Sequence, residues 1–322
     1  MKNLRYVCVQ PRLLYYAWQV EVMINNFIKN GISGNNIDIL VAWNPNDGTN
    51  TPEVIEAWNK LANTYNYVRF FFYQDTREDM SYIPSIYFNI LKQHIAAYPE
   101  LSDEVLFLHD SDIIFTKPVD FSFALNDNIW YLSDTVGYIG TQYILTKGED
   151  VYKGMCDVIG IDPLIPRLLN SNSGGAQHIV KGSTYEYWDK VEKDSIKLYR
   201  WFCEQEPLWE GEGYPIQKWT AGMWSLLWNA WLFGHETKVD KRLDFCWATD
   251  NINRWNDVSI FHNAGVTEHG KLFMKGNYTQ SYPYGIENTF DPNFCSFNYV
   301  NEIIEISHKS CLIVTPLENQ MP

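Results

Sequence analysis

The first 145 residues alternate between apolar segments and amphipathic segments, and this alternation constrains the fold more than any other feature. Short apolar runs are typical of buried strands, whereas apolar positions spaced three and four apart are typical of helices. Strands are predicted at Tyr6–Gln10, Ile37–Trp43, Val68–Tyr73, Val105–His109 and Ile129–Leu132, and helices at Tyr15–Asn30, Val54–Tyr65 and Pro84–Tyr98. Alternation of this kind predicts an α/β fold with a mostly parallel, Rossmann-like sheet flanked by helices on both faces.

The second half of the chain is less regular. Its patterns predict a Gly-rich loop, two helices, a strand that runs into a turn, and an aromatic, loop-rich tail, at Leu169–Gly175, Tyr185–Phe202, Ile216–Phe233, Val258–Ala264 and Asn277–Asn298. No repeat or linker interrupts the 322 residues. We therefore expect a single domain over residues 1–322, in which residues 146–322 form an elaborated C-terminal half.

Charge and composition exclude several kinds of partner. The chain carries 25 basic and 39 acidic residues, a net charge of −14, which disfavours a nucleic acid or an anionic membrane as the main partner. It contains no apolar run long enough to span a membrane, so no membrane span is expected. Its six cysteines are scattered without a Cys-x-x-Cys pair, as in reduced proteins, and a cytoplasmic location is expected.

Two aspartates follow the predicted strand Val105–His109 directly. Because side chains i and i+2 of an extended segment share one side, Asp110 and Asp112 are expected to point to one place at the carboxyl end of a buried strand. Two converging carboxylates repel each other and lose hydration, which a divalent cation such as Mn²⁺ or Mg²⁺ relieves. The alternative is a turn in which the aspartates cap backbone N–H groups, but the apolar Ile113–Phe115 directly behind favours the metal.

Three further segments carry candidate ligand-binding groups. In Asn172–Gln177, paired glycines would let the backbone approach a ligand, and Ser173 and Gln177 would donate hydrogen bonds, although the segment also fits a plain connecting loop. His262 follows an apolar strand and is either a structural histidine or a third metal ligand. Lys271 and Lys275 are either solvated or placed to neutralise a diphosphate.

Together these segments resemble GT-A-fold, metal-dependent glycosyltransferases. The likeness is greatest to the group of hydroxyproline O-arabinosyltransferases and peptidyl-serine galactosyltransferases. The similar motifs lie between residues 15 and 275 and are Ala17–Met23 with its Trp18-Gln19 pair, His109–Phe115 with the Asp-x-Asp motif, Asn172–Gln177, Trp219–Trp224 and Phe261–Gly265.

The resemblance implies a donor, a cofactor and an acceptor. Asp112 and His262, with Asp110, would hold Mn²⁺ or Mg²⁺ on a nucleoside diphosphate sugar, with a UDP-sugar the expected donor; Asp110 would otherwise contact the donor's sugar or ribose. The acceptor would be a hydroxyl on a glycan, a peptide or a small molecule. Residues 1–145 would form the nucleotide-sugar-binding half and residues 146–322 the acceptor-side half. The expected substrate-binding residues are Gln10, Trp18, Gln19, Asp110, Ser173, Gly174, Gly175, Gln177, Trp219, Lys271 and Lys275.

One position departs from the family pattern. Gly222 stands in Trp219–Trp224 where an acidic residue is expected. Glu206, Glu210 and Asp134 are the candidates to replace it as a catalytic carboxylate. The missing acid favours a retaining enzyme, which does not require a base at that place.

Two other functions fit part of the pattern. Aromatic residues make up 16% of the chain and suit a non-catalytic carbohydrate-binding protein with the same fold. A nucleotidyltransferase or metal phosphohydrolase would use the same aspartates, but the segment Gln10–Leu13 after the first predicted strand lacks the glycines of a phosphate-binding loop.

Overall fold

The main sheet has seven strands. The computed structural model describes residues 3–206, 215–267 and 270–312. In spatial order the strands are β3 (Arg69–Gln74), β2 (Ile37–Trp43), β1 (Leu4–Pro11), β4 (Val105–His109), β7 (Gly174–Lys181), β6 (Trp130–Asp134) and β8 (Thr237–Val239). β7 pairs antiparallel with both its neighbours, whereas the remaining pairs are parallel. The predicted α/β fold with a mostly parallel sheet is confirmed.

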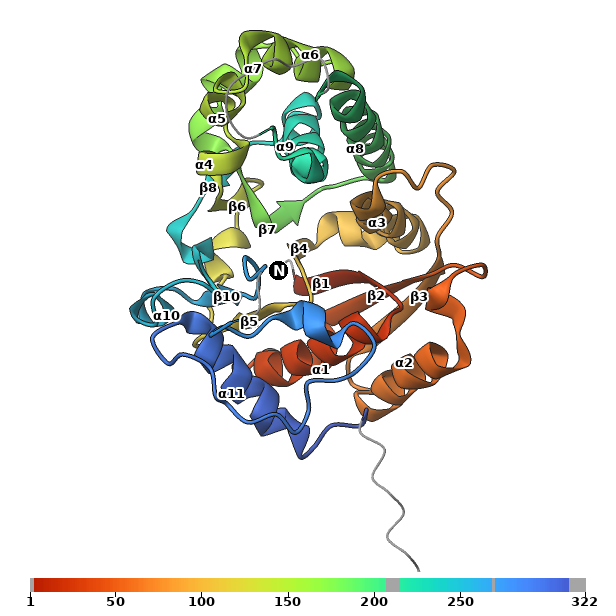
Figure 1. The fold of residues 1–322 in the computed structure, drawn as a ribbon. Coiled ribbons are helices and arrows are strands. Elements are labelled where there is room, and N and C mark those ends of the chain that lie inside the picture. Colours follow the sequence, from red (N-terminus) through yellow and green to blue (C-terminus); the bar gives the residue numbers. More distant parts are fainter. Residues whose placement is uncertain (1–2, 207–214, 268–269, 313–322) are drawn as a thin grey trace, which may run out of the picture.

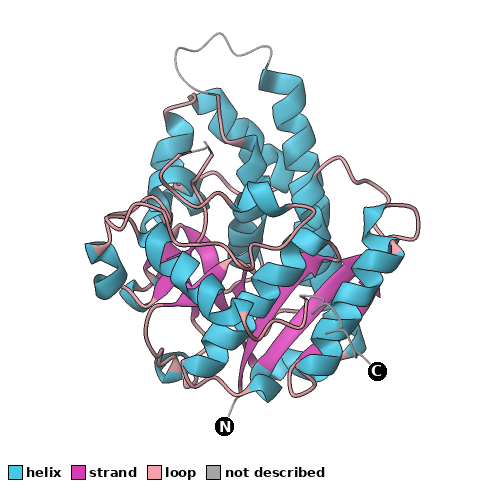
Figure 2. Cartoon of the chain, turned by 60° about the horizontal axis from the view of Figure 1, so that its bottom comes forward, coloured by secondary structure: helices cyan, strands magenta, loops and turns pink. Residues whose placement is uncertain are grey.

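Helices cover both faces of this sheet (Figures 1 and 2). Because side chains alternate along a strand, Tyr6 and Cys8 of β1 pack in one hydrophobic core with α1 (Leu14–Lys29) and α2 (Pro52–Thr64). Val7 and Val9 pack on the opposite face with α3 (Ile86–Ala97) and α8 (Tyr185–Gln205). The central strands β1, β2 and β4 are buried on both faces, which is why their sequences read as continuous apolar runs.

Local signals set the ends of the early helices. Thr51 caps α2, since its side chain accepts a hydrogen bond from the backbone N–H of Val54, and Pro52 occupies the first turn. The chain leaves α1 through Gly31, whose φ of 89° suits a residue without a side chain. The helix predicted from Pro84 begins as a short 3-10 turn, Ile83–Ser85, and becomes α-helical at Ile86.

Sequence patterns did not predict that a group of helices packs together at the top of Figure 1. The helices α4 (Val136–Ile139), α5 (Thr141–Leu145), α6 (Glu149–Ile159) and α7 (Leu164–Leu168) pack around α8 and α9 (Ala221–Leu232) in a third hydrophobic core. Four of them lie in a stretch that sequence patterns left unassigned, because short helices show little periodicity. The helix predicted from Ile216 starts only at Ala221, after a 3-10 turn.

A small second sheet brings distant segments to the end of β4. It consists of β5 (Ile113–Phe115), β10 (Ile260–His262) and β9 (Phe245–Trp247). α10 (Asn253–Asp257) follows β9, and α11 (Cys295–Ser307) packs against α1. The prediction of a loop-rich tail over Asn277–Asn298 is wrong for its last residues, because α11 begins at Cys295. β5 follows Asp112 directly and pairs antiparallel with β10, so that His262 lies opposite Ile113.

Among the described residues, no helix is both long enough and apolar enough to cross a membrane.

Candidate active site

The site lies where three segments of different direction meet. β4 ends at His109, and Asp110–Asp112 turn the chain into β5. Because β7 runs antiparallel to β4, it is the beginning of β7 that lies beside this edge, and His178 pairs with Leu108. β10 adds His262 from the far end of the chain. The topology thus explains why residues from positions 110, 177 and 262 are neighbours.

Asp110, Asp112 and His262 form a candidate metal centre. One ligand atom from each of these residues lies within 4.8 Å of the others. His262 Nε2 is 3.4 Å from Asp112 Oδ1 and 3.7 Å from Asp110 Oδ2. The backbone N–H of Asn263 donates to the carbonyl oxygen of Asp112 at 2.9 Å, which fixes the two segments to each other. Two carboxylates and one imidazole are a ligand set that can hold a divalent metal ion.

Gln177 provides a test of that fit. Its Nε2 lies 3.4 Å from His262 Nδ1, and its Oε1 is buried without a hydrogen-bond partner. A half-turn of the amide would let Oε1 accept from a protonated Nδ1. The imidazole would then present the lone pair of Nε2 to the carboxylates, which is the tautomer that a metal-binding histidine needs. The orphaned oxygen therefore fits a cation at this place.

Lys275 adds a positive charge to the same group. Its Nζ forms an ion pair with Asp112. Burial raises the pKa of Asp112, but Lys275 and His262 lower it by more, so its pKa lies below the ordinary value. Burial, together with Asp112, raises the pKa of Asp110. The two carboxylates outnumber the single lysine, so the group retains an attraction for a cation.

An open cleft of about 880 Å³ surrounds these residues. One half is polar and holds the candidate metal centre, Lys275, Gln10 and Gln19. The other half, which we call the apolar wall, consists of Tyr82, Ile83, Pro84, Trp219, Met223 and Leu226. Among the described residues that line the cleft, Asp110, Asp112 and Lys275 are the only Asp, Glu, Lys or Arg side chains.

Most of the predicted polar residues do meet in this cleft. Gln10, Gln19, Trp219 and Lys275 line it together with Asp110, Asp112 and His262. Gln19 accepts a hydrogen bond from the hydroxyl of Ser111 at 3.3 Å, so the early helix contacts the Asp-x-Asp segment. Gln177 is fully buried and touches the site through His262.

Other predicted residues lie outside the cleft. Trp18 is a core residue with no exposed surface, and its indole N–H donates to the carbonyl oxygen of Tyr278. Ser173 is buried, Lys271 is exposed away from the cleft, and the exposed Asp134 accepts a hydrogen bond from the backbone of Val136. Glu206 forms an ion pair with Lys218 beside a neighbouring pocket that shares Trp219 with the cleft. Glu210 lies outside the described residues.

The paired glycines serve packing. A side chain at Gly174 would place its Cβ 2.5 Å from the Cβ of Leu132, and one at Gly175 would meet Met223 Cε at 2.6 Å. Both glycines are buried in β7 and permit the close approach of β6 and α9. Neither lines the cleft.

The structure also explains Gly222. A Cβ at this position would lie 3.0 Å from both Tyr82 Oη and Phe88 Cε2, so a larger residue would require these rings to shift by a few tenths of an ångström. Two residues of the site had no signal in the sequence. Trp247 stacks on His262 with 5.2 Å between ring centroids, and Tyr82 joins the loop before α3 to α9.

Comparisons with known proteins give only distant similarities. No protein-family model and no curated protein matches the chain. A bifunctional glycosyltransferase, WbbM, superposes with a TM-score of 0.44 and 9% identity over 83% of this chain and 46% of that one, so the chain spans about half of its length. A glycosyltransferase involved in glycosylation of the major capsid of PBCV-1 gives a TM-score of 0.35 and 12% identity over 82% of this chain and 94% of that one.

A mannosyltransferase from Pyrobaculum calidifontis, solved with GDP-Man and Mn²⁺, gives a TM-score of 0.30 and 12% identity over 71% of each chain. At these TM-scores the similarities carry no argument about activity. Any functional inference therefore rests on the residues of the cleft.

Proposed function

We propose that the protein is a metal-dependent glycosyltransferase that moves a sugar from a nucleoside diphosphate sugar to a hydroxyl acceptor. The observation that supports this best is the convergence of Asp110, Asp112 and His262 at the carboxyl end of β4, inside a cleft of about 880 Å³. In parallel sheets this edge is where nucleotides bind. The cleft is large enough for two substrates.

The residues of the polar half have separate roles in this proposal. Asp112, Asp110 and His262 would hold Mn²⁺ or Mg²⁺, which supplies positive charge against the diphosphate when bound. Lys275 is a compact cation that can turn from Asp112 toward a phosphate oxygen. Gln177 orients the imidazole of His262.

The transfer itself breaks one bond and forms another. The bond between the anomeric carbon and the β-phosphate oxygen breaks, and its electron pair stays on the phosphate. Lys275 stabilises that charge. The acceptor oxygen bonds to the anomeric carbon, and its proton passes to the departing phosphate oxygen. Of the candidate bases, Asp134 and Glu206 do not line the cleft, and Glu210 lies outside the described residues.

Nucleotide binding tests the proposal. UDP and GDP are titrated into the protein in a calorimeter with Mn²⁺ and, separately, with EDTA. We expect binding with Mn²⁺ only, with UDP the tighter ligand, and we expect Asp112→Asn to lose it. Asp257→Asn is the matched control, since that carboxylate is exposed on α10 and does not line the cleft. Equal binding with EDTA, or by Asp112→Asn, would contradict the proposal.

A non-catalytic carbohydrate-binding protein is the second candidate, and the exposed aromatic Trp219 in the cleft favours it. Such a protein would bind glycans without regard to Mn²⁺ and nucleoside diphosphate. Hydrolysis or transfer of sugar from a panel of nucleotide sugars in Mn²⁺ separates the two functions.

A further inference from the structure

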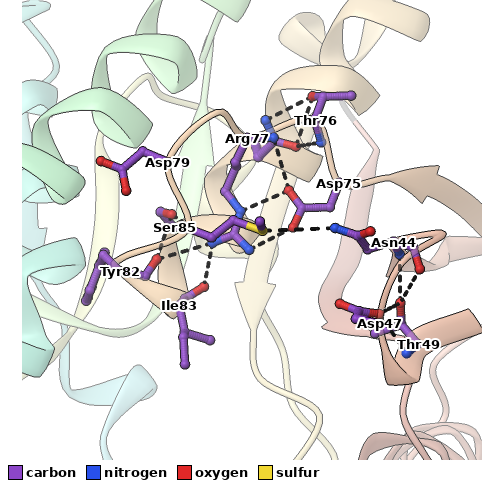
Figure 3. Close-up of polar contacts among 12 residues, drawn as sticks. Asn44, Asp47, Thr49, Asp75, Thr76, Arg77, Asp79, Tyr82, Ile83 and Ser85 are labelled. Carbon is purple, nitrogen blue, oxygen red and sulfur yellow. Dashed lines mark hydrogen bonds and ion pairs between the residues drawn. The ribbon is translucent and has the colours of Figure 1, made fainter.

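The apolar wall depends on the loop of residues 75–85, which is organised around Arg77 (Figure 3). Arg77 Nε and Nη2 donate to the two carboxylate oxygens of Asp75 at 2.9 and 2.8 Å. Nη1 donates to the carbonyl oxygens of Tyr82 and Ile83 and to Ser85 Oγ, at 3.2, 2.9 and 2.9 Å. The guanidinium thus shapes the chain that presents Tyr82 and Ile83 to the cleft.

This ion pair is also hidden from the cleft. The side chains of Arg77 and Asp75 are 5% and 4% exposed, and neither residue lines the cleft. Every nitrogen of the guanidinium already donates to an oxygen of the protein. Because Arg77 is paired with Asp75 and does not line the cleft, it offers no net charge to a ligand there.

Tyr82 connects this loop to the start of α9. Its hydroxyl donates to the carbonyl oxygen of Trp219 at 2.6 Å and accepts from the backbone N–H of Gly222 at 2.8 Å. Its ring stacks on Tyr199 with 5.0 Å between centroids. Both hydrogen-bonding functions of this hydroxyl are used and the side chain is buried, so Tyr82 supports the wall from behind. The wall is consequently fixed before any ligand binds.

The exposed part of the wall is large and uncharged. Ile83 is 61% exposed and Trp219 58% exposed, although both line the cleft. No charged side chain of the described residues lies in this half, whereas Asp110, Asp112 and Lys275 occupy the other. An anionic acceptor would find no counter-charge among the described residues of this half, where Gln217 and Thr220 are the polar residues beside Trp219.

We propose, on the basis of the glycosyltransferase function above, that the acceptor is an uncharged glycoside whose alkyl or aryl aglycone lies on the apolar wall. The sugar hydroxyl then points toward the polar half, where the donor is bound. Trp219 and Ile83 contact the aglycone, and burial of its carbons supplies the affinity. Arg77 is a positioning residue that acts through Tyr82 and Ile83.

Matched pairs of glycosides test the inference. Methyl and n-hexyl β-glucoside, β-galactoside and α-mannoside are titrated below micelle-forming concentrations into protein with Mn²⁺ and UDP. We expect the hexyl member of at least one pair to bind roughly tenfold or more tightly, because burial of each methylene contributes about 0.8 kcal/mol at most. Equal affinities in every pair, no binding of any hexyl glycoside, or tighter binding of a sugar 6-phosphate would overturn the proposal.

Variants locate the effect on the wall. Trp219→Ala and Ile83→Ser change exposed side chains and are expected to reduce the hexyl preference about fivefold or more, which corresponds to about 1 kcal/mol. Leu168→Ala is the matched control, since Leu168 is 79% exposed and outside the cleft. An unchanged preference in both wall variants would contradict the inference.

Arg77→Lys tests the positioning role. We expect the KM for the hexyl glycoside to rise while the affinity for UDP with Mn²⁺ stays the same. Arg200→Lys, which alters the exposed ion pair with Asp79 in the same loop, is the control. If the wild-type protein does not bind UDP in the presence of Mn²⁺, the proposed function itself is contradicted. Intact UDP binding without a hexyl preference would break only this inference.

Discussion

The two halves of the cleft use charge in opposite ways. In the polar half, Asp112 and Lys275 form an ion pair that lines the cleft, and the carboxylate of Asp110 beside them is half exposed and left to act on a ligand. Behind the apolar wall, Arg77 and Asp75 neutralise each other in a buried pair, and their charges serve only to shape the loop. The difference indicates that one half acts by electrostatics and the other by shape and apolar surface.

The difference has a structural origin. The polar half is built from strand ends, where side chains leave a sheet that is already fixed by β1, β4 and β7. The wall is built from a loop, two 3-10 turns and the beginning of α9, which are not joined to each other by the hydrogen bonds of a sheet. The contacts of Arg77 and Tyr82 take the place of such hydrogen bonds. We therefore expect substitutions in the two halves to fail in different ways.

The largest expected effect is on the polar half. Asp112→Asn removes a carboxylate that lies 3.4 Å from His262 and pairs with Lys275. By comparison with the loss of a single charge-stabilising group in other enzymes, transfer should fall about 100- to 1000-fold. Transfer rates within threefold of wild type would contradict the view that the polar half acts through the charge of Asp112.

Behind the wall, the expected failure is of stability. Arg77→Met leaves Asp75 buried without its partner, and the free energy of unfolding should fall by about 3–5 kcal/mol. Arg200→Met breaks an exposed pair with Asp79 in the same loop and should cost at most about 1 kcal/mol. Urea unfolding measures both. Similar losses for the two variants would show that Arg77 does not organise the loop.

Lys275→Met distinguishes the role of the lysine from that of the carboxylates in the polar half. Removal of the lysine frees Asp112 from its ion pair, so Mn²⁺ alone should bind more tightly, whereas UDP in the presence of Mn²⁺ should bind roughly tenfold more weakly because a phosphate contact is lost. Manganese titration by electron paramagnetic resonance and calorimetry with UDP give the two affinities. Lys271→Met, outside the cleft, should change neither. A parallel loss of both affinities would contradict separate roles.

Sequence patterns were most accurate where a segment is buried on both faces. The strands Ile37–Trp43 and Val105–His109 were predicted to the residue, because apolar runs there coincide with the strand ends. Asp110 and Asp112 were predicted to converge for the same reason. The strand β10 lies within the predicted strand Val258–Ala264. β9 was not predicted, and the pairing of this small sheet was not either, since it joins segments far apart in the chain.

Misplaced residues share one physical cause. Gly174 and Gly175 were interpreted as a ligand-binding backbone, but their neighbours Leu132 and Met223 lie on other elements, and only the fold shows that the space is needed for packing. Trp18 fills the core for a similar reason. Tyr82 was missed because its role depends on the main chain of residues 219 and 222, which no local pattern reveals.

The smallest expected effect sharpens the comparison at the junction of the two halves. His178 lines the cleft, its Nε2 is buried without a partner, and burial lowers its pKa from 6.5 to about 4. In the unfolded chain this histidine binds a proton near pH 6.5, so between pH 6.5 and 4 the unfolded state holds more protons. Stability should therefore fall with falling pH across this window, by at most about 1.4 kcal/mol per pH unit for this one group. His178→Gln should remove that part of the slope in urea unfolding series. Equal slopes for wild type and His178→Gln would mean that His178 binds a proton in the folded protein as readily as in the unfolded chain. His178 would then be a charged residue of the polar half.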